Sequence, residues 1–231
     1  QIAQVLEKKF SETTENQPEL VAHHYTEAGL AEQAIPYWQR AGEKATQRSA
    51  NSEALSHLSK GLALLKTLPD TVEHARQELM LQIALGAPLV ATRGYGAPEV
   101  EKAYARAREL CQHIGETPQL FPVLRGLWVF YLVRGELQTA RELGEQLLSL
   151  AQSVQDPILL LEARLALGAT LSWLGDLTAA REHSEQGITL YDPHKHHSHA
   201  FLYGHDPGVI CLSYTARTLW VLGYPDQALK R

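Results

Sequence analysis

The residues best suited to bind a metal are histidines gathered in residues 191–206. They are His194, His196, His197, His199 and His205, with His183 upstream. Neutral imidazoles are good ligands for zinc, nickel or copper, but this spacing forms no i, i+4 pair within one helix and no cysteine lies nearby. We therefore predict an exposed, inserted polar loop without a metal. A mild pH sensor is a second interpretation, because several imidazoles would become charged together on mild acidification.

The sequence lacks the common motifs for nucleotide binding and catalysis. AGEKAT at 41–46 ends like a phosphate-binding loop, but it has no upstream glycine and no preceding strand, so it predicts plain helix. Gly94 and Gly96, with Pro98 behind them, indicate a connection between two helices. A nucleophile elbow and an HExxH helix are both missing. We therefore expect no catalytic residues and no cofactor.

Composition limits the possible partners. Hydrophobic residues make up 45% of the 231 residues and charged residues 20%, which is typical of an ordinary folded protein. The net charge of −5 gives no basic field, so we expect binding to neither nucleic acid nor a membrane. The apolar stretch 120–133 contains Arg125 and is too short to span a bilayer.

The two cysteines, Cys111 and Cys211, lie in apolar periodic segments and make no disulfide framework. Isolated thiols fit a reducing compartment, and no signal peptide opens the chain, so we expect a cytoplasmic location. The chain begins at Gln1 rather than methionine and ends within what looks like a new helix. We expect it to be a piece of a longer polypeptide.

Helical periodicity extends along almost the whole sequence, and no segment alternates in the manner of a strand. The dipeptides Thr117–Pro118, Asp156–Pro157 and Asp206–Pro207 each place a capping side chain before a proline, which favours the start of a helix. Five glycines follow apolar helical runs and predict helix ends: Gly29, Gly115, Gly135, Gly175 and Gly223. We predict an all-α fold of about 11–12 antiparallel helices.

Internal repetition is the strongest pattern in the chain. GELQTARELGEQLLSL at 135–150 and GDLTAAREHSEQGITL at 175–190 match at eight of sixteen positions with an offset of 40 residues. Weaker copies occur at 29–38, 49–58 and 223–231. In each copy one alanine is small enough for two helices to approach closely. These alanines are Ala34, Ala54, Ala140, Ala180 and Ala228.

The repeat unit resembles the tetratricopeptide repeat. The shared features are a turn glycine with an acid near it, an alanine five residues after that glycine, and bulky or small residues in the first helix at Trp128, Tyr131 and Gly168. The resemblance implies a right-handed α-α superhelix, a TPR-like solenoid extending over residues 1–231 as one domain. The 40-residue spacing exceeds the family's 34, so we expect longer helices, with residues 191–206 as an inserted loop.

Longer segments are similar to the helical-repeat region of large bacterial signalling proteins. These segments are PELVAHHYTEAGLAEQAIPYWQRAGEKA (18–45), GYGAPEVEKAYARARELC (94–111), VFYLVRGELQTARELGEQLL (129–148) and YGHDPGVICLSYTARTLWVLGYPDQAL (203–229). In those proteins a class III adenylate/guanylate cyclase domain precedes an ATPase domain, and the repeats follow. The resemblance implies a sensor or protein-binding arm whose partners include the attached ATPase and cyclase domains.

The repeat register places one face of every first helix along the inner side of such a superhelix, where a protein or peptide partner would bind. The predicted partner-binding groove consists of Arg125, Val129, Leu132, Glu162, Ser172, Trp173, Tyr214 and Arg217. Arginine and aromatic residues are common anchors in interfaces. We expect a non-catalytic module for protein–protein interaction and regulation. The alternative is a small-molecule sensor that binds an apolar effector inside the superhelix.

Overall fold

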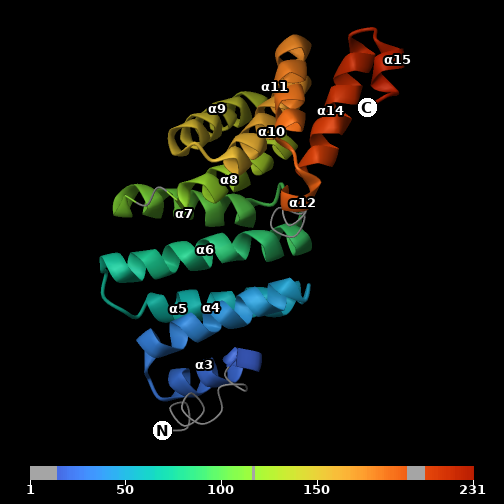
Figure 1. Ribbon diagram of the computed structural model, residues 1–231. Coiled ribbons are helices and arrows are strands. Elements are labelled where there is room, and N and C mark those ends of the chain that lie inside the picture. The colour runs from blue at the N-terminus through green and yellow to red at the C-terminus, as the bar shows by residue number, and fades with distance from the viewer. Residues whose placement is uncertain (1–14, 116–117, 197–205) are drawn as a thin grey trace. The chain divides into compact units, whose positions relative to one another are not determined.

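The computed structural model describes residues 15–115, 118–196 and 206–231, and these residues are helical with no β-strand among them. The helices are α3 (Pro18–Glu27), α4 (Ala31–Gln47), α5 (Asn51–Leu65), α6 (Val72–Arg93), α7 (Pro98–Ile114), α8 (Leu120–Arg134), α9 (Leu137–Val154), α10 (Pro157–Leu174), α11 (Leu177–Leu190), α12 (Pro193–His196), α14 (Pro207–Val221) and α15 (Pro225–Ala228) (Figure 1). The predicted all-α fold is confirmed. Each helix packs mainly against its neighbours in sequence, as in a solenoid.

The chain divides into two compact units, where the repeat pattern predicts one continuous domain. Unit 1 comprises residues 1–123 and unit 2 comprises residues 124–231. The division falls within α8. Each unit has its own set of packed helices, so the contacts that hold the fold together are mostly local.

In unit 1, α4 packs against α3 and α5, and α6 packs against α5 and α7. One apolar core contains Ile35, Leu58 and Leu81, which join α4, α5 and α6. Close approach depends on small residues at the contacts. A methyl group at Gly42 would lie 2.5 Å from the Cγ atom of Leu58, and one at Gly86 would overlap the ring of Tyr104 on α7.

In unit 2, α10 is the central helix and packs against α9, α11 and α14. It is long and apolar enough to cross a membrane by length and composition, but 61% of it is buried. That degree of burial is typical of a core helix. At Gly168 an added methyl group would collide with Ser184, so this glycine allows α10 and α11 to pack closely.

Helix boundaries follow the local signals. The carboxylates of Asp156 and Asp206 accept hydrogen bonds from the first amides of α10 and α14, which confirms two of the predicted caps. Thr117 lies outside the described residues. Gly115 and Gly175 end α7 and α10 with φ angles of 75° and 86°, the left-handed conformation that glycine adopts without strain.

Candidate functional site

Two members of the predicted groove are buried in unit 2. The Nε atom of Arg125 on α8 lies 2.8 Å from the Oε2 atom of Glu162 on α10. The two residues are only 5% and 1% exposed. Their charges therefore neutralise one another inside the protein, which corrects the expectation that both face an open groove. The repeat register places both residues on first helices, but only packing shows that they meet. Val129 and Leu132 on the same α8 are half-buried.

The other predicted residues form a group where the C-terminal end of α10 meets α14, and only Trp173 among them is exposed. We call this group the Arg217 cluster: Ser172, Trp173, Tyr214 and Arg217. The guanidinium carbon of Arg217 lies 3.9 Å from the centroid of the Trp173 ring and 5.2 Å from that of Tyr214. Its Nη2 atom donates a hydrogen bond of 2.9 Å to the Ser172 hydroxyl. The Trp173 indole donates to the Tyr214 hydroxyl at 3.2 Å. These four residues of the predicted groove therefore contact one another.

The Arg217 cluster carries a half-buried positive charge. Among the described residues no carboxylate forms an ion pair with Arg217. Trp173 is 56% exposed, although its edge is bound to Tyr214. Stacking on the two rings holds the guanidinium in place, so little side-chain entropy is left to lose when an anionic group binds it. The arrangement is therefore chemically suited to contact a carboxylate that lies beside an apolar group.

The remaining tryptophans differ in their surroundings. Trp38 is buried in the core of unit 1, and Trp128 is buried in unit 2, where its indole donates to the Thr170 hydroxyl at 2.9 Å. Trp220, by contrast, is 61% exposed on α14. Core packing accounts for the first two, whereas Trp173 belongs to the Arg217 cluster.

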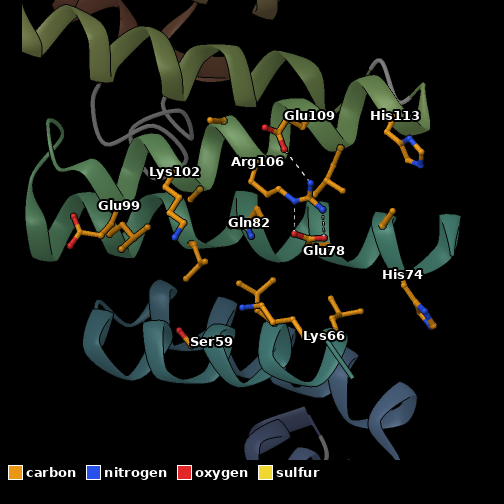
Figure 2. Close-up of a pocket in the computed structure, with 18 of the residues that line it drawn as sticks. Ser59, Lys66, His74, Glu78, Gln82, Glu99, Lys102, Arg106, Glu109 and His113 are labelled. Carbon is orange, nitrogen blue, oxygen red and sulfur yellow. Dashed lines mark hydrogen bonds and ion pairs between the residues drawn. The ribbon is translucent and has the colours of Figure 1, made fainter. Parts of the chain in front are cut away.

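A groove in unit 1 was not predicted from the sequence. It lies between α5 and α7 over α6, has a volume of about 1180 Å³ and is open to solvent along one side. Figure 2 shows Ser59 and Lys66 on one side of this space, Gln82 on α6, and Lys102 and Arg106 on the other side. The groove was missed because no motif marks it, and the space exists only because α5 and α7 stay apart over α6.

One ion-pair network crosses the groove between α6 and α7. The Nε and Nη2 atoms of Arg106 donate to the two carboxylate oxygens of Glu78 at 2.8 and 2.9 Å, and its Nη1 atom donates to Glu109 at 3.1 Å (Figure 2). The hydrogen bonds from Arg106 lower the pKa of Glu78, although burial opposes this shift. The pair holds α6 and α7 together along the groove.

The histidine-rich segment is described only in part. Tyr191 and Asp206 close its two ends, with a hydrogen bond of 2.7 Å from the tyrosine hydroxyl to the aspartate Oδ2 atom, which contributes most to raising the pKa of Tyr191 to about 12. His194 lies in α12, whereas His197, His199 and His205 fall outside the described residues. Among residues that are described, no group of three or more histidine, cysteine, aspartate or glutamate side chains is arranged to hold a metal ion.

His183 on α11 contacts Arg164 on α10. The Nη1 atom of Arg164 on α10 lies 3.0 Å from its Nδ1 atom, a distance at which the arginine donates to a neutral imidazole. Burial and then the positive charge of Arg164 lower the pKa of His183. This histidine therefore acts in the contact between α10 and α11.

Comparisons with known proteins give little further guidance. No model of a known protein family matches this chain. The chain is similar to an uncharacterized protein of Rhizobium meliloti strain 1021, with 27% identity over 217 residues. The match covers 91% of this chain but 21% of that protein, so the chain spans about a fifth of the length of the relative.

Proposed function

We propose that this chain is a non-catalytic helical-repeat module that binds a protein or peptide partner through the Arg217 cluster. The single observation that carries the proposal is the half-buried Arg217 guanidinium, which contacts the rings of Trp173 and Tyr214 and has no carboxylate partner among the described residues. Arginine and tryptophan are the residue types that most often dominate binding energy in interfaces. A partner with an acidic residue next to an apolar one would pair with Arg217 and cover Trp173.

The proposal extends to regulation. The resemblance to cyclase–ATPase signalling proteins and the much greater length of the Rhizobium relative support a module within a larger protein. In that setting the module would bind a partner and thereby regulate an attached ATPase or nucleotide cyclase domain. The attached ATPase and cyclase domains would themselves be among the binding partners of the module.

Photo-cross-linking tests the binding part. A benzoylphenylalanine in place of Leu174, which is partly exposed beside the cluster, would capture the partner in cells that contain the protein. The affinity of the purified partner is then measured for Trp173→Ala/Arg217→Glu and for the matched control Trp220→Ala/Arg134→Glu, both of whose positions are exposed outside the cluster. We expect at least about thirtyfold weaker binding for the first variant, because loss of a hot spot costs about 2 kcal/mol or more.

Equal affinities for the two variants would remove the Arg217 cluster as the binding site. The regulatory part is tested separately, by comparing nucleotide turnover of the full-length protein with and without Trp173→Ala/Arg217→Glu. An unchanged rate across partner concentrations would contradict regulation through this cluster, whatever the outcome of the binding experiment.

A further inference from the structure

The groove of unit 1 is bounded by three helix faces that run along its length. The residues that line it recur every three or four positions within 55–66 of α5 and the turn after it, within 75–93 of α6 and within 99–113 of α7 (Figure 2). A spacing of three or four residues is the period of one helix face. The groove is therefore an elongated trough along the helices rather than a compact pocket at one point.

The size of the trough fits a helix better than a small molecule. Its volume of about 1180 Å³ exceeds the usual range of small-ligand pockets. At a rise of about 1.5 Å per residue, the lining face of α7 extends for about 21 Å, the length of a helix of about 14 residues. An amphipathic helix lying between α5 and α7 over α6 would bind in the way that amphipathic helices bind the grooves of other proteins.

One wall of the trough is apolar. Leu55 and Leu62 on α5 and Leu89 on α6 are half-buried against the core of unit 1, and their remaining surface faces the groove. Burying apolar surface contributes roughly 25 cal/mol per Å². A partner helix with a leucine-type stripe would cover these side chains.

Three cations along the rim form no ion pair with a described residue. Glu78 and Glu109, the acids in the middle of the groove, are already paired with Arg106. The exposed Lys66, Arg93 and Lys102 lie along the same rim, and none of them forms an ion pair.

The uncommitted acids of the groove, Asp70 and Glu99, lie toward its ends, in the α5–α6 turn and at the start of α7. Along the whole rim, the three cations Lys66, Arg93 and Lys102 therefore outnumber the two uncommitted acids. This charge pattern favours the binding of an acidic helix over a basic one.

From these observations we propose that the groove of unit 1 is a second binding site, which takes an acidic amphipathic α-helix of a protein partner. The leucine wall contacts the apolar stripe of that helix, and Lys66 and Lys102 pair with carboxylates on its two flanks. This site lies in unit 1 and uses none of the residues of the Arg217 cluster.

A display library provides a defined probe. It consists of 14-residue amphipathic helices with a constant leucine stripe and flanking positions varied among glutamate, lysine and glutamine, selected on the 231-residue chain. We expect enrichment of glutamate at the flanks. The enriched peptide, labelled with fluorescein, should then bind saturably in an anisotropy titration.

Charge-reversal variants of the protein show where the peptide binds. We expect Lys66→Glu/Lys102→Glu to weaken the acidic peptide at least tenfold and to strengthen its lysine-flanked counterpart. Arg134→Glu/Lys230→Glu, which makes the same change in net charge at exposed positions of unit 2, should leave both affinities unchanged. Because all four positions are exposed, the folded state should persist, which circular dichroism checks.

Three results would overturn the proposal. They are failure of the library to yield a saturable binder, acidic binders that are insensitive to Lys66→Glu/Lys102→Glu, and an apolar dye that binds in the groove when no helix does. Trp173→Ala/Arg217→Glu should leave peptide binding intact, so failure of this site is distinguishable from failure of the proposed function.

Discussion

The guanidinium of Arg217 on α14 lies flat against the indole of Trp173 on α10, 3.9 Å from the ring centroid. The two helices are separated in sequence by α11 and by the histidine-rich segment, yet they pack directly against each other in unit 2. The contact thus forms where the repeat pattern resumes after its interruption. The Arg217 side chain thus makes a contact between two helices and is also the centre of the proposed binding site.

Removing that contact should change stability only slightly. We expect Arg217→Ala to lower the free energy of unfolding by about 0.5–1 kcal/mol, since a cation–π contact at an exposed site contributes about that much. Urea unfolding followed by tryptophan fluorescence measures the change. A loss of several kcal/mol would show that Arg217 is mainly a structural residue, which would weaken its assignment as a partner contact.

The buried pair of Arg125 and Glu162 should behave differently. We expect Glu162→Ala to destabilise the protein by about 3–5 kcal/mol, because it leaves a buried guanidinium without its carboxylate. The double variant Arg125→Met/Glu162→Leu should recover most of that loss. Urea denaturation of the three proteins provides the comparison. If the single and double variants were destabilised to a similar extent, the pair would stabilise the protein through its shape rather than through its charges.

His183 should make the stability of unit 2 depend on pH. Its pKa is lowered in the folded state by burial and by Arg164, so the unfolded chain binds the proton more readily. Stability is therefore fully present above the ordinary histidine pKa and is lost as the pH falls through it. We expect His183→Gln to flatten the fall in Tm between about pH 7 and pH 5. The exposed His113→Gln serves as control and should leave the slope as in the unsubstituted chain.

A titration with zinc tests directly whether the histidine-rich segment binds a metal. We expect isothermal titration with Zn²⁺ to show no saturable site in the micromolar range, because the histidine spacing matches no established ligand pattern. A saturable site that disappears on replacing His194, His197 and His199 by glutamine would contradict the prediction of a polar loop without a metal.

The repeat register predicted helix contacts well where a single small residue, alanine, is enough to let two helices pack closely. Ala34, Ala54, Ala140 and Ala180, identified only from the spacing of the repeat, are all fully buried at helix contacts. Small size is a local property, and the helical period determines which face carries it. The same register placed Trp173, Tyr214 and Arg217 on one face, and they contact one another because α10 and α14 pack together.

Exposure and open space were harder to predict. The register placed Arg125 and Glu162 in the same groove as Trp173, but Arg125 and Glu162 are buried whereas Trp173 is exposed. The groove beside Lys66 and Lys102 gave no sequence pattern at all. Burial and grooves depend on how far apart neighbouring helices lie, and that distance is the result of many side-chain contacts together.

The sequence by itself therefore determined the all-α class, the helix boundaries at Asp156, Asp206 and Gly175, and the small residues where helices touch. These features depend on interactions within one helix or its ends, over a few residues of chain. Only the tertiary structure decided that Arg125 pairs with Glu162, that Arg217 has no carboxylate partner among the described residues, and that a trough lies between α5 and α7. Each of these depends on residues far apart in the chain, whose meeting no local pattern encodes.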